Sequence, residues 1–218
     1  MSDVVFTLDD KRIQYLKRRD SKLSLVIDRI GPIKSYVPED IFGFIVGEIV
    51  GQMLSNKVGD ILEARLRKLC NNNISYQNIL GLRSEEMRSI GLAYSKCEYL
   101  HNFATAVQNG SIVLDDLMTM DENEAFKKLT SIRGIGSWTA KMVLLFCLLR
   151  EDVLPFEDGA FLQSYKWLYQ TDDISRKSIE KTCSCWKPYS SIAARYMYRA
   201  LDYGLTKKDV ALFLREVK

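Results

Sequence analysis

A short glycine-containing turn is the first feature of the sequence that could take part in chemistry. The pattern of residues 129–146 predicts the end of one helix, a tight turn and the start of another helix. Gly134 and Gly136 allow a ligand to approach the backbone closely, and the amide N–H groups at a helix N-terminus bind anions. The turn is therefore either a phosphate-binding site or a simple connection between two helices.

A carboxylate follows this turn further along the chain. Pro155 ends the preceding helical segment, and Glu157 and Asp158 stand directly before an apolar helix predicted at 161–169. Asp158 is either an ordinary N-cap of that helix or a group that acts on a ligand. Adjacent residues at a helix start point in different directions, so we expect Glu157 to be solvated or to cap the helix.

The composition predicts a folded, mostly helical protein. The chain has 218 residues, of which 47% are hydrophobic and 27% charged, which excludes disordered and coiled-coil classes. Only 4 prolines and 12 glycines occur, and amphipathic spacing recurs along the chain, including residues 1–37. We therefore expect an all-α fold. The expected helices are at 11–19, 21–30, 41–55, 57–70, 75–80, 84–89, 95–108, 114–118, 122–131 and 161–169.

The cysteine and histidine content gives little support to a metal centre. His101 is the single histidine, and the five cysteines are scattered without paired CxxC elements, so we expect neither a zinc site nor an iron–sulfur cluster. The N-terminal residues show no signal-peptide pattern, and no apolar stretch reaches about 18 residues. We expect a cytoplasmic protein without a membrane span.

Basic residues are concentrated near the C-terminus. The net charge is only +3, but residues 176–218 carry many lysines and arginines and few acids. Such a stretch either meets a polyanion or forms an ordinary solvated face.

Two segments together carry a specific resemblance. Gly134–Ala140 followed by Val153–Asp158 resembles the helix-hairpin-helix, Gly/Pro-rich loop and Asp signature of the HhH-GPD superfamily of base-excision DNA glycosylases. Within that superfamily, the chain is most similar to the bacterial 3-methyladenine DNA glycosylase II family. Further similar segments are Gly51–Ser55, Ile90–Cys97 and Trp186–Ser191, and the likeness covers residues 38–204 in order.

The resemblance implies a fold and a function. Residues 1–218 would form a single helical unit of two packed lobes with a cleft between them, with the helix-hairpin-helix at 123–149. The implied function is that of a monofunctional DNA glycosylase, which flips out and excises alkylated bases of the 3-methyladenine and 7-methylguanine type. The expected partner is double-stranded DNA with a damaged base. We expect a monomer in the bacterial cytosol or nucleoid.

The resemblance also assigns roles in the chemistry. Asp158 would stabilise the positive charge that develops on the sugar when the glycosidic bond breaks. Trp138 stands where bifunctional members have a lysine, which implies that the chain has no lyase activity. Trp138, Tyr198 and Met142 would line the base pocket. Met142 and Gly159 replace residues that are often aromatic in the family, which predicts a pocket that is roomier or differently selective. Trp186, Phe42 and Phe44 are further aromatic candidates. Core packing is the alternative for Tyr198, Trp186 and Phe42.

DNA contacts follow from the same resemblance. The amides of Gly134 and Gly136 would hold a phosphate, Gln52 would contact the minor groove or the orphaned base, and Met53 would be the wedge that fills the gap left by the flipped base. The alternative for Met53 is ordinary core packing. The implied cofactor is at most a Na⁺ or K⁺ ion, bound by the main-chain carbonyls of Thr130, Ile132 and Ile135.

Two other functions remain open at this point. One is a glycosylase for a different lesion, such as a deaminated or mismatched base, because Asp158 and the hairpin are shared while the pocket differs. The other is a DNA-binding module without chemistry. Asp158 and Met53 argue against the module, since simple binding needs neither a catalytic carboxylate nor a wedge.

Overall fold

The structure is a computed structural model, which describes residues 3–210 and Phe213. The chain divides into two compact units. One unit combines Met1–Val37 with Leu149–Lys218, and the other is the continuous segment Pro38–Leu148. Within the described residues, none of the helices is long and apolar enough to cross a membrane.

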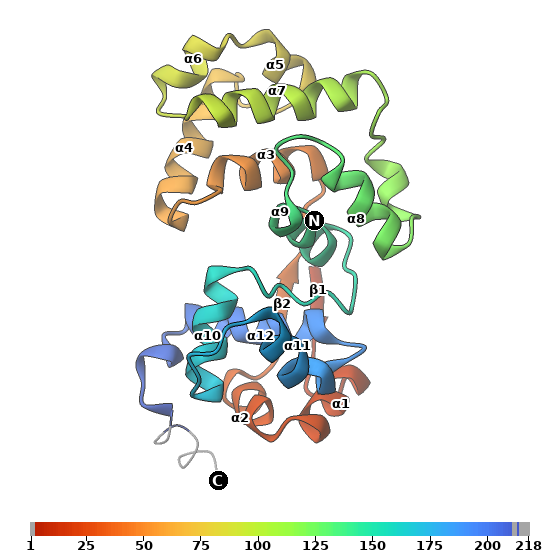
Figure 1. The fold of residues 1–218 in the computed structure, drawn as a ribbon, viewed down its shortest axis with the longest axis vertical. Coiled ribbons are helices and arrows are strands. Elements are labelled where there is room, and N and C mark those ends of the chain that lie inside the picture. Colours follow the sequence, from red (N-terminus) through yellow and green to blue (C-terminus); the bar gives the residue numbers. More distant parts are fainter. Residues whose placement is uncertain (1–2, 211–212, 214–218) are drawn as a thin grey trace. The chain divides into compact units, whose positions relative to one another are not determined.

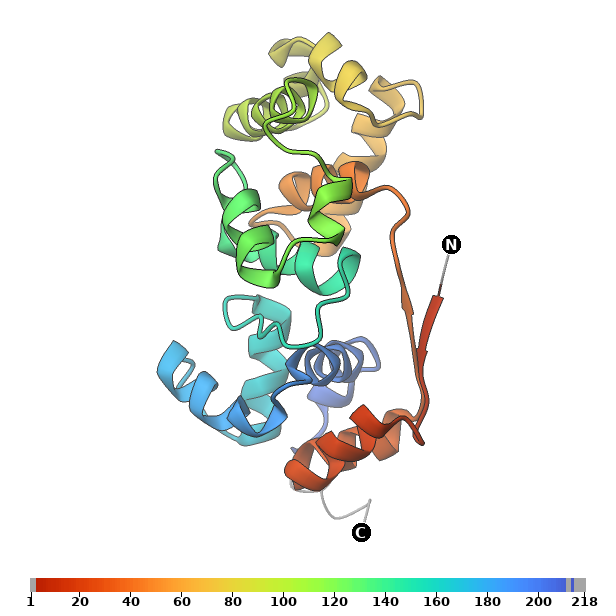
Figure 2. The same ribbon diagram turned by 90° about the vertical axis from the view of Figure 1, so that its right-hand side faces the viewer.

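The unit built from both chain ends is helical, with one small sheet. Strands β1 (Asp3–Phe6) and β2 (Ile33–Tyr36) pair antiparallel, with Asp3 opposite Tyr36, and lie side by side in Figure 2. The sequence analysis expected only helices here, because four-residue strands are too short to show alternation. The other elements are α1 (Lys11–Arg19), α2 (Ser21–Ile30), α10 (Gly159–Tyr169), α11 (Arg176–Thr182), η3 (Cys183–Trp186), α12 (Ser190–Asp202) and η4 (Leu205–Lys207).

All the regular elements described in the continuous unit are helices. In Figure 1, α7 runs beside α5 and α6. Together with the first unit, this confirms the predicted all-α class. The elements are α3 (Ile41–Gly51), α4 (Asn56–Leu69), α5 (Tyr76–Gly81), α6 (Ser84–Ser89), α7 (Tyr94–Gln108), η1 (Asp115–Met118), α8 (Glu122–Thr130), α9 (Ser137–Met142) and the π-helical turn η2 (Val143–Cys147).

A buried carboxylate organises the core of the first unit. Asp20 caps α2, and its Oδ1 accepts hydrogen bonds from the amides of Lys22 and Leu23 at 3.0 Å each. Its Oδ2 accepts the indole N–H of Trp186 at 2.9 Å and the hydroxyl of Tyr169. Trp186 is completely buried. Trp186 is therefore a core residue, and the alternative weighed for it in the sequence analysis is the correct one.

We expect Asp20→Ala to lower the free energy of unfolding by about 3 kcal/mol, because it leaves the indole N–H of buried Trp186 and the hydroxyl of half-buried Tyr169 without their acceptor. Urea denaturation would measure this loss. The matched control is Asp173→Ala: Asp173 is exposed, and its Oδ1 accepts the amide of Ser175 at the solvent-facing start of α11, so the expected loss there is below about 1 kcal/mol. Equal losses in the two variants would contradict the assignment.

Candidate active site

The glycine turn connects two well-formed helices. Helix α8 begins with a capping box, in which Asp121 Oδ1 accepts the amide of Glu124 at 2.8 Å. The turn that follows is closed by a hydrogen bond from the Ile135 amide to the Ile132 carbonyl at 3.0 Å. Both isoleucine side chains are buried. They anchor the turn between the two helices.

The two glycines of the turn have different surroundings. Gly134 has a φ of +108°, and a Cβ built on it would lie 2.4 Å from the Cβ of Tyr99. No side chain fits there. Gly136 has a φ of −86° and caps α9, and a Cβ built on it would meet no atom within 4 Å. Open space therefore adjoins the N-terminus of α9, where a ligand can approach the backbone amides.

Asp158 caps helix α10. Its Oδ1 accepts the amide of Phe161 at 2.8 Å, so the N-cap interpretation is correct. This hydrogen bond fixes the position of the carboxylate at the start of α10. Asp158 is buried but keeps 8% of its surface exposed. The N-terminus of α10 adds positive electrostatic potential beside it.

The segment that leads to Asp158 is fixed to the N-terminus of α12. The amide of Ser191 donates to the carbonyl of Glu151 at 2.9 Å, and its hydroxyl oxygen accepts the amide of Val153 at 2.9 Å. The hydroxyl of Ser190 donates to Asp152 Oδ1 at 2.5 Å. These bonds limit the freedom of the chain before α10.

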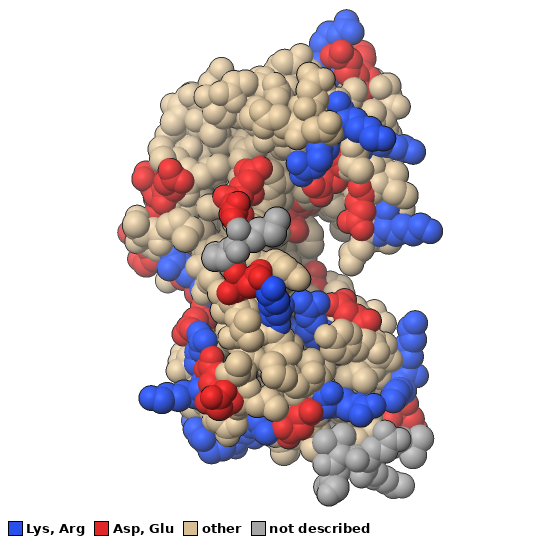
Figure 3. Space-filling view, turned by 180° about the vertical axis from the view of Figure 1, so that it is seen from behind, with Lys and Arg blue, Asp and Glu red and all other residues tan. Residues whose placement is uncertain are grey.

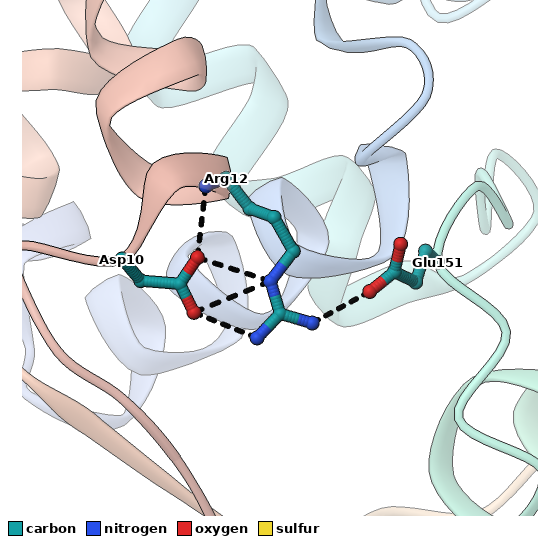
Figure 4. A network of polar contacts seen from close by, with 3 residues as sticks. All are labelled: Asp10, Arg12 and Glu151. Carbon is teal, nitrogen blue, oxygen red and sulfur yellow. Dashed lines mark hydrogen bonds and ion pairs between the residues drawn. The ribbon is translucent and has the colours of Figure 1, made fainter.

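Arg12 attaches the same segment to α1. Its guanidinium donates to both oxygens of Asp10, at distances of 2.6 to 3.2 Å, and to Glu151 Oε1 at 2.5 Å (Figure 4). The hydrogen bond from Arg12 lowers the pKa of the Asp10 carboxyl below its usual range. The ionised form of Asp10 is thus preferred in the folded state.

The contribution of Asp10 to stability should disappear in acid. A carboxyl with a lowered pKa in the folded state stabilises the fold above its unfolded pKa of about 4, and this stabilisation is lost as the pH falls through the folded value. The difference in free energy of unfolding between the wild type and Asp10→Asn should therefore shrink from about pH 6 to about pH 3. Urea titrations at several pH values would measure it, and a constant difference would contradict the assignment.

Met53 lies in the turn between α3 and α4. Its side chain is fully exposed and its φ is +58°. Core packing, the alternative weighed for this residue, is therefore wrong. The preceding residue behaves differently: the Gln52 side-chain amide donates to the Gly134 carbonyl at 2.9 Å and to Thr139 Oγ1 at 3.1 Å. Gln52 thus contacts the hairpin, a contact that the sequence did not indicate.

Met53→Gly should stabilise the protein while lowering the glycosylase activity that the sequence resemblance implies. Glycine removes the strain of a left-handed residue, which is worth about 1 kcal/mol, and it also removes the wedge that the resemblance implies. Met53→Ala serves as the control, because alanine keeps the strain and loses only the side chain. We expect both variants to lose at least roughly tenfold in excision rate, with a higher melting temperature for the glycine variant alone.

A family match covers most of the segments described so far. The model of the HhH-GPD superfamily of base excision DNA repair proteins matches residues 46–188, from α3 to the segment before α12. The chain belongs to the HhH-GPD superfamily.

Relatives and solved structures agree with this membership. The chain is 26% identical to DNA-3-methyladenine glycosylase 1 of Schizosaccharomyces pombe, over 82% of this chain and 80% of that protein. It is 32% identical to a DNA-3-methyladenine glycosylase of Bacillus subtilis over 58% of this chain, but this match spans only 42% of the Bacillus protein.

Two solved structures resemble the chain along nearly its whole length. The crystal structure of DNA-3-methyladenine glycosidase from Bacillus halodurans has a TM-score of 0.81 and 27% identity, covering 94% of this chain and 96% of that one. The Schizosaccharomyces pombe 3-methyladenine DNA glycosylase Mag1, in complex with abasic DNA, has a TM-score of 0.80 and 25% identity, covering 88% and 97%.

The predicted pocket residues of this HhH-GPD protein differ in burial. Trp138 on α9 and Tyr198 on α12 are half-buried, whereas Met142 is 4% exposed. A Cβ built on Gly159 would meet no atom within 4 Å, so space remains beside the first residue of α10. Phe42 stacks on Phe103 with ring centroids 4.9 Å apart and is buried in the core.

In residues 176–210, several arginines of the basic stretch near the C-terminus contact other groups of the protein. Arg176 pairs with Glu180 at 2.8 Å, and Arg199 pairs with Asp202 at 3.3 Å. Arg195 is buried and donates to the hydroxyl of Ser35. In the view of Figure 3, basic and acidic side chains are intermixed. Three arginines of the stretch are therefore engaged within the protein, and their charge is not fully available to a polyanion.

Proposed function

We propose that this HhH-GPD protein is a DNA glycosylase that excises alkylated bases of the 3-methyladenine and 7-methylguanine type. The observation that carries the proposal is the likeness to a DNA-3-methyladenine glycosidase over 94% of this chain and 96% of that one. Such complete coverage leaves little of either chain for a different architecture. Double-stranded DNA with a damaged base is the proposed partner of a monomeric protein in the cytoplasm.

The chemistry assigns one task to Asp158. Breaking the bond between base and sugar leaves positive charge on the sugar, and a fixed carboxylate beside the anomeric carbon stabilises that charge. The hydrogen bond from the Phe161 amide at 2.8 Å holds the carboxylate in a defined orientation, so little reorganisation is needed during the reaction. A base alkylated on a ring nitrogen leaves as a neutral molecule from a cationic state, and it needs little help from a general acid.

The hairpin and the exposed methionine supply the remaining tasks. The open backbone at Gly136 would bind a phosphate through amides at the N-terminus of α9, which fixes the register of the DNA without reading its sequence. Met53, with its flexible unbranched side chain, would fill the space left by the flipped base. Trp138 and Tyr198 would stack against that base.

Monofunctional action is part of the proposal. Lyase activity requires an amine that forms a Schiff base with the sugar, and Trp138 occupies the position of the lysine in bifunctional members. Borohydride should therefore trap no covalent adduct between the wild-type protein and damaged DNA. A substantial yield of trapped adduct would contradict this part of the proposal alone.

A monovalent cation at the hairpin is compatible with the residues present. Thr130 ends α8, where carbonyl groups lack partners inside the helix and the helix dipole favours a cation. The Ile132 carbonyl accepts one hydrogen bond, from the Ile135 amide, and a carbonyl oxygen has a second lone pair. With the Ile135 carbonyl, these oxygens would hold Na⁺ or K⁺, which would add positive potential near a bound phosphate.

The decisive experiment is incubation of the purified protein with methylated DNA, followed by chromatography of the released bases. Release of 3-methyladenine or 7-methylguanine by the wild type supports the proposal. Release of only uracil or hypoxanthine from suitable duplexes would indicate a different lesion. Tight binding without any release would indicate a binding module and would overturn the enzymatic assignment.

A further inference from the structure

The residues around Met53 form a β-turn with an unusual occupant. The amide of Leu54 donates to the carbonyl of Gly51 at 3.0 Å. Gln52 has φ −46° and ψ 129°, and Met53 has φ +58°. These angles are those of a type II turn, whose third residue is normally glycine or asparagine because its φ is positive. A methionine at this position needs support from its surroundings.

One support comes from the hairpin. The Gln52 side chain bonds with two groups of the hairpin, the Gly134 carbonyl and the Thr139 hydroxyl oxygen. A carbonyl can only accept, so the partner of Gly134 must be the amide nitrogen of Gln52, which fixes the orientation of this side chain. Gly134 is also the glycine whose position is fixed against Tyr99. The turn is thereby tied to the most constrained point of the hairpin.

A second support comes from helix α7. The ammonium group of Lys96 donates to the carbonyl of Val50 at 2.6 Å. Val50 is the penultimate residue of α3, where helix carbonyls lack partners within the helix. Lys96 thus fixes the end of α3 on one side of the turn, while Gln52 fixes the turn itself to the hairpin on the other.

We infer that Gln52 is a positioning residue, which holds the Met53 turn in register with the phosphate-binding hairpin. Its side-chain nitrogen bonds within the protein, to Gly134 and Thr139, instead of serving as a direct reader of DNA. The inference rests on the proposed function, because it assigns Met53 the role of a wedge. It predicts that Gln52 affects excision only through Met53.

A double-mutant cycle tests this dependence. Gln52→Leu removes the donor without adding charge, and it should lower the single-turnover excision rate on methylated duplex by roughly tenfold. In the Met53→Ala background, the same substitution should change the rate by less than about twofold, because the wedge it positions is gone. Gln77→Leu, at an exposed site on α5, is the matched control and should leave the rate unchanged.

Equal losses in both backgrounds would overturn the inference, because Gln52 would then act on DNA or on the hairpin independently of Met53. Thr139→Val provides a second test if Gln52→Leu folds poorly. Valine keeps the volume of Thr139, which is 1% exposed, and removes the Oγ1 acceptor of the Gln52 side chain. We expect a smaller loss in excision rate than for Gln52→Leu, and no loss in the Met53→Ala background. A loss that persists there would count against the inference.

Failure of the proposed function would be visible separately. If the wild type excises no base, the double-mutant cycle uses binding instead of rate. The dissociation constant for a duplex with an abasic-site analogue is then measured for Gln52→Leu in the wild-type and Met53→Ala backgrounds. Weaker binding by Gln52→Leu only when Met53 is present would still support the positioning role. An equal weakening in both backgrounds would overturn it.

Discussion

Asp158→Asn should lower the rate of base excision by roughly 10³-fold while leaving the protein folded. Asparagine is as good an N-cap as aspartate, and its side-chain oxygen can still accept the Phe161 amide. The substitution therefore removes the negative charge and keeps the local structure. Single-turnover kinetics on methylated DNA and a thermal melt of the same preparation would separate the two properties.

The control for Asp158→Asn is the same substitution at another helix start. Asp40 caps α3, with its Oδ1 accepting the Gly43 amide at 2.9 Å, and Asp40→Asn should leave the excision rate within about twofold of the wild type. A rate for Asp158→Asn that is close to the wild-type rate would show that Asp158 is only a cap. The enzymatic proposal would then need another carboxylate.

Gly134→Ala should have the second large effect. The added methyl group would lie 2.4 Å from Tyr99 Cβ, at a φ of +108° that is strained for any side chain. Backbone strain and overpacking together should lower the free energy of unfolding by about 4 kcal/mol, and binding to a duplex with an abasic-site analogue should fall at least roughly 100-fold. Urea denaturation and fluorescence anisotropy would measure the two effects.

Gly136→Ala is the matched control within the same turn. Its φ is −86°, and a methyl group would meet no atom within 4 Å, so the free energy of unfolding should change by less than about 0.5 kcal/mol. Its methyl group would occupy the space where the proposed phosphate approaches the amides. We therefore expect weaker DNA binding without a loss of stability, and equal destabilisation by both substitutions would contradict the difference in packing.

The sequence predicted the helices well because their signals are local. The apolar spacing of α3 and the caps Asp40 and Asp158 mark helix positions directly, and the pattern Gly134–Gly136 marks the hairpin turn. The predicted helix at 41–55 nevertheless extends beyond the observed end of α3 at Gly51. Met53 falls on the apolar period of that helix, so only the three-dimensional turn reveals that it leaves the core.

Long-range contacts could not be predicted from the same signals. The bond between Asp20 and Trp186 joins residues 166 positions apart, and nothing in the spacing of either residue indicates the other. The same holds for the bond from Gln52 to Gly134, which spans 82 positions. Strands β1 and β2 were missed because each has four residues and obtains its hydrogen bonds only from its partner.

The discontinuous unit has a consequence for the order in which the protein can form during synthesis. Helices α1 and α2 leave the ribosome first, but α10 and α12, which pack on α2, leave it only after the whole segment Pro38–Leu148. The unit Pro38–Leu148 is one continuous segment, so all the helices that pack within it have been synthesised before α10 and α12. A nascent chain arrested after Leu148 would therefore carry the hairpin and the Met53 turn but lack Asp158, so interrupted translation would yield a product without the proposed catalytic group.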